Sequence, residues 1–543
     1  MIGPDKEDFK QLYEEAEGSY LKFNRIMKEN GNEPMSERTF QRRVSQWIRG
    51  GEPYKPTVKD EQEDTRPVTG GTVHAPDKRR GSLKGKRFVF TSAQNNTDVH
   101  ETFWENLLNF CDHRDAQLVI GRFTYNKSGF QNYSKDKDDE LYYDPKVLPY
   151  ITDESRNVED AHSGLVWCGE LDVLPTAVNP LSGLDSYTHT ASAIIPHAKV
   201  QLKSVPVLRG DPVKMLYTTG ACTKRNYIQR KAGQKAEFHH VFGALYVEID
   251  EDGDHFARQI IADSTGSFYD LDEYFCNGLV SQGEVEGINW GDIHAEMLDE
   301  TVANSAWRNE DSILDTLKPK YQFIHDLIDF KARNHHNIKN PHFLAERHFE
   351  DTGNVNAGME IAAYTLKEME RPFCTTIVVE SNHDQAFRRW LAEADIRTDP
   401  ENAWYFHYSN AKLHHQIILG NPGFHIFEWA LREHRDLPNT QFLDEDDSFI
   451  ICGANGIECG MHGHRGPNGA RGNPNSLRTL GRKCNVGHAH SAAIMDGIYV
   501  AGITCKMDMG YNKGPSSWSH SFIITYPNAK RQIVTIKNGK WRA

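Results

Sequence analysis

Apolar runs that stop at polar side chains recur through the second half of the chain. The clearest is Thr375–Val379, a β-branched run typical of a buried strand. It leads into Ser381–Asp384, whose side chains can bind a metal ion, move a proton and accept a hydrogen bond. Open α/β sheets bind ligands beyond the carboxyl ends of their strands, so this stretch is a candidate site. Asn and Asp are also common in turns, so the hypothesis requires other strands to end in the same way.

The same patterns predict the elements of residues 86–286. A strand at Arg87–Gln94, a helix at Thr102–Phe110 and a strand at Ala116–Gly121 form a βαβ opening. Further strands are expected at Ala198–Val205, Lys214–Thr219 and Gly243–Ile249. We expect an α/β accessory domain that acts as a scaffold or grips substrate.

The first 49 residues predict a separate helical module. Helical spacing occurs at Phe9–Glu17 and Tyr20–Lys28 and resumes, after a break, at Met35–Arg49. Arg42 and Arg43 lie beside the apolar stripe of the third helix, a pattern that resembles a helix-turn-helix with a basic recognition helix. A three-helix cap or a partner-binding module fits equally well, so DNA contact by Arg42 and Arg43 is one of two interpretations.

The chain therefore predicts four segments. The helical module (1–49) is followed by a linker (50–85) rich in Gly, Pro, Thr and charged residues. The accessory domain (86–286) precedes a region (287–543) in which strands repeatedly end in Asp, Asn or His and helices lie between them. This last region is expected to be the catalytic domain, and its end predicts a hairpin of two strands.

One stretch of the accessory domain raises a separate enzymatic hypothesis. Its βαβ opening, together with Thr218–Thr223, faintly resembles the carbon–nitrogen hydrolase (nitrilase) family, which uses Glu, Lys and a nucleophilic Cys. The Glu motif expected after the second strand is absent, because the chain reads Gly121–Tyr125 there. Cys222 is therefore interpreted as structural, and the domain as non-catalytic.

Composition narrows the class of protein. A chain of 543 residues with 38% hydrophobic content and ten Trp should form two to four globular domains. No apolar run approaches the roughly 20 residues needed to span a bilayer, and the N-terminus lacks signal-peptide features. Nine scattered cysteines without a CxxC pair indicate a reduced, cytoplasmic compartment. The 26 histidines become more frequent after residue 290. Because histidine is the commonest metal ligand, a metal enzyme is the leading hypothesis.

Five predicted strand ends carry metal-binding residue types. They are Asp292-x-His294, Asp326-x-x-Asp329, Asn382-His383-Asp384, His462-Gly-His464 and His488-Ala-His490. An Asp-x-His on an extended segment places both side chains on one side, so that both can reach one ion. In this order the motifs resemble the calcineurin-like metallophosphoesterases over residues 287–540. His325 and Ser381 stand where that family usually has Gly.

The resemblance implies a fold, a ligand set and a mechanism. The fold would be a four-layer αββα sandwich within an α/β (α+β) chain. One metal would be held by Asp292, His294 and His490, with Asp326 bridging to a second metal completed by Asn382, His462 and His488. Mixed carboxylate, amide and imidazole ligands suit two divalent ions, and the family often uses Mn, with Mg, Fe or Zn as alternatives.

The chemistry of such a pair is hydrolysis of a phosphoester. Two cations clamp the phosphoryl group, and a water that bridges them is acidified to hydroxide and attacks phosphorus in line. The leaving oxygen then needs a proton. His383, adjacent to Asn382 but not a ligand, is expected to supply it, with Asp329 orienting its ring.

A basic segment between the fourth and fifth motifs bears on the substrate. It contains Arg465, Arg471, Arg478 and Arg482, follows His464 directly and has no acidic residue. Arg binds phosphate oxygens in a bidentate manner, so these side chains are candidate DNA contacts. The alternative is a loop whose charges are merely solvated. The net charge of −14 argues against wholesale coating by nucleic acid but allows such a local groove.

Two blocks, His462–Gly472 and Asp508–His520, resemble a subgroup of metallophosphoesterases encoded by tailed bacteriophages. Its members include pre-early nucleases that degrade host DNA and are related in mechanism to double-strand-break repair nucleases. The second block is rich in Gly, Asn, Ser and aromatics and either lines a nucleic-acid strand or packs as a loop. The resemblance implies a Mn-dependent deoxyribonuclease in the cytoplasm of an infected bacterium. Its partner would be DNA, with no membrane, and a homo-oligomer or a phage protein is a further possibility.

Two other functions fit parts of the pattern. A phosphatase or small-molecule phosphodiesterase would use the same metals, but some 280 residues precede the catalytic region and a small substrate needs no such apparatus. A non-catalytic, DNA-binding phage regulator would use residues 1–49 and keep the rest as scaffold. The intact set of metal-binding side chains argues against that alternative.

Overall fold

The computed structural model describes residues 5–16, 20–31, 35, 39–40, 43–48, 81–127, 142–159, 164–334 and 337–543. The chain divides into two compact units, residues 1–71 and residues 72–543.

The smaller unit contains the first two helices that residues 1–49 predict, whereas the third, expected at Met35–Arg49, lies partly outside the described residues. Its described elements are α1 (Lys6–Glu15), α2 (Tyr20–Glu29) and a π-helix (Val44–Ile48). Phe9, Phe23 and Phe40 are buried together at its centre. The guanidinium of Arg43 stacks over Trp47 at 4.7 Å, so part of this side chain packs on its own module. Arg42 lies outside the described residues, and DNA binding by this unit stays a prediction.

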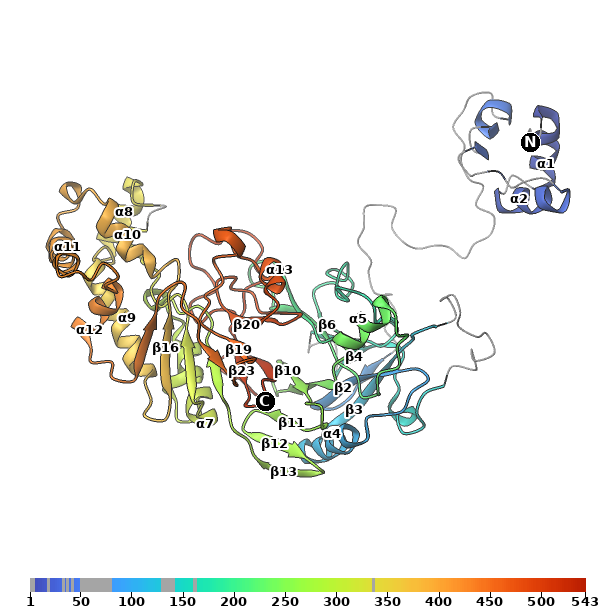
Figure 1. Ribbon diagram of the computed structural model, residues 1–543, viewed down its shortest axis with the longest axis horizontal. Helices are drawn as coiled ribbons and strands as arrows, with labels where there is room; N and C mark the ends of the chain where they lie inside the picture. The colour runs from blue at the N-terminus through green and yellow to red at the C-terminus, as the bar shows by residue number, and fades with distance from the viewer. Residues whose placement is uncertain are drawn as a thin grey trace. The chain divides into compact units, whose positions relative to one another are not determined.

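The larger unit is mixed α/β, and its described strands form four sheets (Figure 1). The six-stranded sheet has the order β17 (Thr440–Leu443), β16 (Thr375–Val379), β15 (Tyr321–Ile324), β14 (Gly287–Asn289), β23 (Ser521–Thr525), β24 (Arg531–Thr535). The 11-stranded sheet has the order β1 (Ser82–Leu83), β4 (Ser155–Val158), β5 (Leu165–Cys168), β6 (Ser192–Ile195), β8 (Lys214–Thr218), β7 (Leu202–Val205), β21 (Ala493–Met495), β22 (Ile498–Val500), β20 (Lys483–Val486), β19 (Ile457–Glu458), β18 (Ile450–Ile451). The smaller sheets are β10 (His255–Ile261), β9 (Gly243–Ile249), β2 (Arg87–Gln94), β3 (Gln117–Phe123), and β11 (Phe268–Asp270), β12 (Glu273–Cys276), β13 (Leu279–Gln282).

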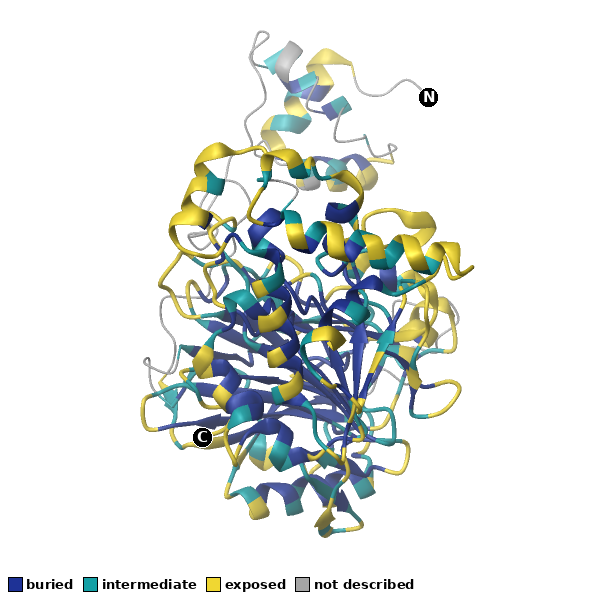
Figure 2. Cartoon of the chain, turned by 90° about the vertical axis from the view of Figure 1, so that its left-hand side faces the viewer, coloured by how far each residue is buried: buried dark blue, intermediate teal, exposed yellow. Residues whose placement is uncertain are grey.

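Helices connect and cover these sheets. The α-helices of the larger unit are α4 (Glu101–Arg114), α5 (Lys231–His239), α6 (Glu300–Ala303), α7 (Ile313–Leu317), α8 (Pro341–Phe349), α9 (Val355–Met369), α10 (Gln385–Glu393), α11 (Ala403–Ile418), α12 (Ile426–His434) and α13 (Pro474–Leu477). Figure 2 shows that the helices facing the viewer are exposed on their outer faces, whereas the strands behind them are buried. No helix among the described residues combines the length and apolar character that crossing a bilayer requires.

The six-stranded sheet is buried on both faces. Ile324 of β15 and Val378 of β16 pack among the apolar side chains of α9, α10 and α12. Phe323 and Ile377 each precede one of these residues, so their side chains point to the other face of the sheet. They pack against Ile457 of β19 in the other large sheet. A strand covered on both faces needs a continuous apolar run, which is the pattern of Thr375–Val379. The chain is thus mixed α/β, and the specific four-layer sandwich stays a prediction.

Strand direction in this sheet determines where the loops lie. β14 pairs parallel with β15, β15 with β16, and β16 with β17. The carboxyl ends of these strands therefore meet at one edge. In the neighbouring sheet, β19 and β20 are also parallel to each other. The polar segments that follow β14, β15, β16, β19 and β20 are those that contain the five motifs.

Many elements match the sequence patterns closely. The strands predicted at Arg87–Gln94, Gly243–Ile249 and Thr375–Val379 have these bounds in the structure. The βαβ opening is confirmed, because β2 and β3 are parallel and α4 lies between them in sequence. The closing hairpin is confirmed by the antiparallel pair β23 and β24.

The expected accessory and catalytic regions share a sheet. β7, from residues 86–286, pairs antiparallel with β21, from residues 287–543. All of residues 72–543 fall in one compact unit. The division near residue 286 stays a prediction, but any such domains are joined by hydrogen-bonded strands.

The nine cysteines are all free thiols, as their spacing predicts. Cys222 is fully buried, and burial raises the pKa of its thiol to about 12. A thiol that stays protonated is a poor nucleophile, which agrees with the structural interpretation of Cys222.

Arg531 on β24 links the two large sheets. Its buried guanidinium donates to the carbonyl of Cys484 at 2.9 Å, to Asn485 Oδ1 at 2.9 Å and to the carbonyl of Gly497 at 3.0 Å. It also lies 3.9 Å from the ring centroid of Tyr499. Among the described residues, the charge is thus compensated by carbonyl oxygens and an aromatic face.

We expect Arg531→Met to lower the unfolding free energy by about 2–4 kcal/mol, because buried carbonyls lose their donor. The measurement is the thermal denaturation midpoint. Arg397→Ala is the control, since its side chain is 86% exposed and should leave the midpoint unchanged. Equal midpoints for Arg531→Met and wild type would contradict this role.

Candidate metal centre

The loops that follow β14, β15 and β20 hold their side chains through tight backbone bonds. The backbone N–H of His294 donates to the carbonyl of Asp326 at 2.7 Å, and the N–H of Asp292 donates to that of Gly502 at 3.1 Å. His294, Asp326, His488 and His490 all adopt left-handed backbone conformations, with φ between 42° and 66°. Such conformations are uncommon outside Gly and cluster at functional sites.

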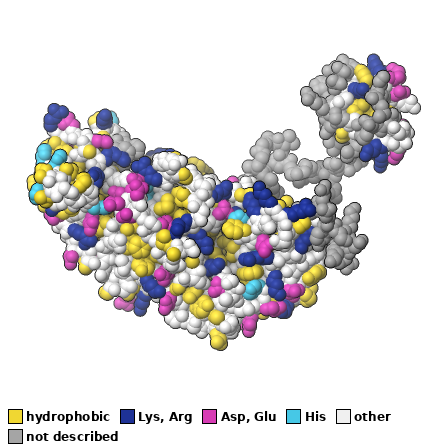
Figure 3. Space-filling view, viewed as in Figure 1, with side chains coloured by type: hydrophobic (Ala, Val, Ile, Leu, Met, Phe, Trp, Pro, Cys, Tyr) yellow, Lys and Arg dark blue, Asp and Glu magenta, His cyan; other side chains and the backbone are white. Residues whose placement is uncertain are grey.

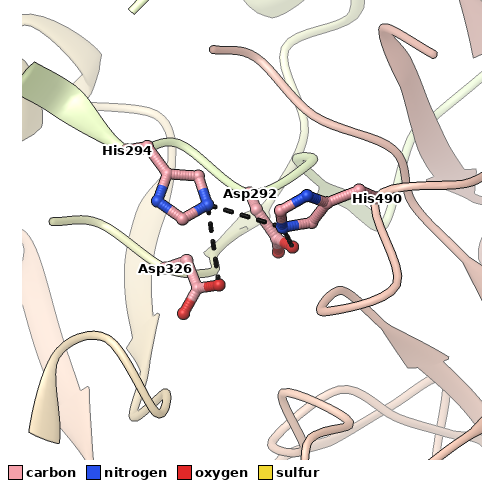
Figure 4. Close-up of side chains that lie close together, drawn as sticks. All are labelled: Asp292, His294, Asp326 and His490. Atoms are coloured by element: carbon pink, nitrogen blue, oxygen red, sulfur yellow. Dashed lines mark hydrogen bonds and ion pairs between the residues drawn. The ribbon is translucent and has the colours of Figure 1, made fainter. Parts of the chain in front are cut away.

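Asp292, His294, Asp326 and His490 form the first group of converging side chains (Figure 4). His490 Nε2 lies 3.1 Å from Asp292 Oδ2, and His294 Nε2 lies 3.5 Å from His490 Nε2. The same His294 nitrogen is 3.7 Å from Asp326 Oδ2. One ligand atom from each residue lies within 4.8 Å of the others, a spacing that a single cation can bridge.

A second group is built from Asp326, His462 and His488. His462 Nε2 lies 3.4 Å from Asp326 Oδ1, so the two oxygens of Asp326 face different groups. Asn382 supplies a buried Oδ1 that has no hydrogen-bond partner among the described residues. The Asp and His side chains among the predicted ligands therefore fall into two groups that share Asp326.

The two groups contain several buried polar atoms without partners. Among the described residues, these atoms have no hydrogen bond: Asp292 Oδ2, His294 Nδ1, both carboxylate oxygens of Asp326, Asn382 Oδ1, and both ring nitrogens of His462. Leaving such atoms unsatisfied is costly, and a cation removes the cost at several of them at once. Oxygen and imidazole donors fit Mn, Mg, Fe or Zn.

Electrostatics in the cluster favour charged carboxylates. Although burial disfavours the anion, His462 and His383 hold the pKa of Asp326 well below its usual range. Burial, reinforced by His462, lowers the pKa of His488 to about 4. Asp326 is therefore an anion and His488 a neutral imidazole, which are the forms that bind metal ions.

Asp329 contacts two histidines in different ways. Its Oδ1 lies 3.3 Å from His294 Nδ1, the ring nitrogen that faces away from the first group. A carboxylate in this position orients a ligand histidine. His383 Nδ1 hydrogen-bonds the backbone carbonyl of Asp329 at 3.0 Å, whereas the Asp329 carboxylate is 3.7 Å away. Asp329 thus positions His383 chiefly through its main chain.

His383 lies beside the first group, with its ring 4.7 Å from that of His294, and its ligand nitrogen lies within 4.8 Å of ligand atoms of His294 and Asp329. Burial disfavours its imidazolium, but Asp326 and Asp329 outweigh burial and raise the pKa of His383 to about 9. Asp384 secures the turn: its Oδ1 accepts from the Ile328 N–H at 3.3 Å, and its Oδ2 accepts from Ser381 Oγ at 2.9 Å. Ser381 thus stabilises the turn that carries His383.

His325 is fully buried, and its Nε2 lies 3.5 Å from Asn289 Nδ2. Burial and the neighbouring His462 lower its pKa to about 4, so the ring is neutral. His325 is not part of either ligand group among the described residues.

Glu296 is a functional residue that sequence reasoning missed. Its half-buried carboxylate accepts the backbone N–H of Asp329 at 2.7 Å and that of Phe330 at 3.1 Å. It thereby fixes the loop that carries Asp329. The residue lies two positions after His294, but nothing in its sequence context distinguishes it from a surface Glu.

The basic residues predicted to bind phosphate lie in three different environments. His464 Nε2 and Arg465 Nε both contact Glu445 Oε1, at 2.8 and 2.7 Å. These two side chains therefore already pair with a carboxylate that lies outside the basic segment. Arg471 is exposed and lines a cavity of about 470 Å³ beside His488. Arg478 and Arg482 line a separate cavity of about 560 Å³. The segment is therefore not one continuous phosphate-binding surface.

Aromatic side chains flank the His490 side of the first group. The ring of Trp518 lies 4.3 Å from that of His490, with the planes near perpendicular. Tyr511 is half exposed, and its ring is 6.3 Å from that of Trp518. The block Asp508–His520 thus lies beside the first group.

This fold and site define a class: a mixed α/β protein in which buried Asp and His side chains from several strand ends can hold metal ions. The chain is 42% identical over 518 residues to Protein A1 of Escherichia phage T5, a match that covers 92% of this chain and 91% of the phage protein. The chain therefore belongs to the family of this bacteriophage protein. No family model and no solved structure matches it.

We expect Gly487→Ala to weaken Mn²⁺ binding at least tenfold, the size of effect seen when the support of a ligand is lost. A Cβ at Gly487 would lie 2.3 Å from Asp292 Oδ1 and 3.0 Å from His325 Cβ, so Asp292 must move. Isothermal titration of metal-free protein measures the affinity. Gly423→Ala is the matched control, because its Cβ would meet no atom within 4 Å. Unchanged affinity in Gly487→Ala would refute the assignment of Asp292 as a ligand.

Proposed function

We propose that the protein is a divalent-metal-dependent phosphodiesterase that hydrolyses DNA, working with two ions, most naturally Mn²⁺. The observation that carries the proposal is the pair of buried ligand groups that share Asp326, with His383 beside them. The order of the five motifs, which resembles that of the calcineurin-like metallophosphoesterases, supports the same reaction class.

Divalent ions in such a site neutralise charge on a phosphoryl group and make a coordinated water acidic. Asp292, His294 and His490 would hold one ion, Asn382, His462 and His488 the other, and Asp326 both. The chain's own groups then position the ligands: Asp329 orients His294, and Glu296 fixes the Asp329 loop.

His383 is proposed as the general acid. With Nδ1 bonded to the Asp329 carbonyl, its Nε2 is the atom that can give a proton to the leaving oxygen. The carboxylates around it favour the protonated ring before transfer. This role needs His383 near the ions but not bound to them.

DNA is the proposed substrate for three reasons. The chain belongs to a bacteriophage family, and its blocks His462–Gly472 and Asp508–His520 resemble those of phage nucleases. Arg471 lines a cavity beside His488, where it can contact a phosphate next to the scissile one. Tyr511 and Trp518 offer aromatic faces next to His490. The setting would be the cytoplasm of an infected bacterium.

The proposal predicts that purified protein degrades plasmid DNA with Mn²⁺ and stops when EDTA is added. A nitrophenyl phosphodiester is assayed in parallel. Turnover of the small ester with intact plasmid would favour a small-molecule phosphodiesterase. Inertness toward both substrates would favour a non-catalytic, DNA-binding regulator.

His383→Ala should bind Mn²⁺ like wild type yet lose about 10²–10⁴-fold in turnover, the usual contribution of a general acid. Asn382→Ala should instead weaken Mn²⁺ binding, because it removes a ligand oxygen. The paired measurements are Mn²⁺ titration and the rate of DNA cleavage at saturating metal. If His383→Ala also loses the metal, the division of roles between these neighbours is wrong.

A further inference from the structure

A basic cavity of about 560 Å³ lies apart from the ligand groups, between the end of α5 and the segment that follows α13. Six cationic side chains line it: Lys199, Arg225, Arg478, Arg482, Lys483 and Lys530. The carboxylates that line it are those of Asp263 and Asp496, which leaves an excess of four positive charges. In Figure 3, Lys and Arg side chains gather on the molecular surface around α5.

Asp496 is already engaged by several cations. Its Oδ1 lies 2.5 Å from Lys199 Nζ, and the Lys199 side chain is almost fully buried. Arg478 Nη1 lies 3.5 Å from Asp496 Oδ2, and His239 Nδ1 lies 3.7 Å from Oδ1. The one carboxylate at this end of the cavity therefore cannot neutralise the remaining charges.

Lys483 and Lys530 make no ion pair with any described residue. Burial lowers the pKa of Lys530 and the nearby Lys483 lowers it further, and Asp263 offsets these effects only in part. Like charges held together in a partly buried cavity are unfavourable unless an anion joins them. An anionic group with several oxygens is the ligand that this arrangement suits.

The cavity also offers aromatic surface. Phe238 is 83% exposed although it is a large apolar side chain, and its ring lies 5.0 Å from that of His239. The guanidinium of Arg225 lies 5.2 Å from the ring centroid of Phe242. An exposed aromatic ring beside cations, as at Phe238, is the combination that binds a base together with its phosphate. These features favour a nucleotide over a bare inorganic anion.

The cavity and the metal groups are connected by one short strand. Lys483 begins β20 at the cavity, and His488 follows the other end of this strand. Five residues of extended chain span at most roughly 17 Å. Phosphates in one strand of duplex DNA recur about every 3.4 Å along the axis, so several nucleotides fit between the two sites.

We propose that this cavity binds the phosphate of a nucleotide, and that in DNA this nucleotide lies a few positions from the cleaved bond. The second part rests on the proposed function. The shared chemistry is a nucleotide phosphate, carried either by a DNA strand or by a free nucleotide. Residues 86–286 would then contribute to substrate binding, through Lys199, Arg225 and Phe238.

The test removes two exposed charges, Arg482→Ala together with Lys483→Ala, and measures binding of a labelled single-stranded oligonucleotide by fluorescence anisotropy in EDTA. The logarithm of the affinity is followed against the logarithm of KCl concentration. Each lost phosphate contact should reduce the slope by roughly 0.7. The matched control, Arg397→Ala with Lys367→Ala, also removes two positive charges but outside the cavity and should keep the wild-type slope. Thermal denaturation verifies that both variants are folded.

A second arm measures binding of deoxyadenosine monophosphate to the same proteins. A reduced DNA slope in the cavity variant alone assigns the cavity to the DNA strand. Loss of nucleotide binding with an unchanged DNA slope assigns it to a free nucleotide. If neither changes, or if the control variant behaves identically, the inference is overturned. Because no metal is present, this result is independent of whether the protein cleaves DNA with Mn²⁺.

Discussion

The structure depends on the contact between two sheets whose strands end on the same side. β14, β15 and β16 deliver Asp292, Asp326 and Asn382 from one sheet, and β19 and β20 deliver histidines from the other. Apolar packing between Phe323, Ile377 and Ile457 sets the distance between these ends. The geometry of the ligand groups is thus fixed by side chains that cannot touch a metal ion. A rigid scaffold of this kind is what a preorganised site requires.

Burial gives the cluster its chemical character. Carboxylates and imidazoles that would each be stable in water lie at a site from which water is largely removed. Their charges balance only in part, since each oxygen of Asp326 faces a histidine but makes no hydrogen bond among the described residues. The same cluster that would bind ions also sets the protonation of His383, because its anions lie close to that ring. Binding and proton transfer therefore share one electrostatic environment.

Local patterns are sufficient to predict several strands and the motifs that follow them. β2, β9 and β16 were predicted to the residue, because buried strands need uninterrupted β-branched or aromatic runs. The pairing of β7 with β21 could not be predicted, since partners almost 300 residues apart leave no local signal. Glu296 and Glu445 were missed for the same reason: each acts on a residue distant in sequence. Arg471 lines a different cavity from Arg478 and Arg482, and this separation could not be predicted because it depends on how the loop folds.

The left-handed backbone at His294, Asp326, His488 and His490 has a consequence for which residues these positions can accept. Of the non-glycine residues, Asn, Asp and His tolerate this conformation best, and others incur strain of about 1–3 kcal/mol. These are also the residue types that coordinate hard and intermediate cations. Glu or Gln could still supply an oxygen ligand. Either replacement would nevertheless be unfavourable for two reasons: the longer side chain places its oxygen differently, and the residue is strained in the left-handed main-chain conformation. The backbone conformation therefore restricts the residue types that these four positions can accept as much as coordination chemistry does.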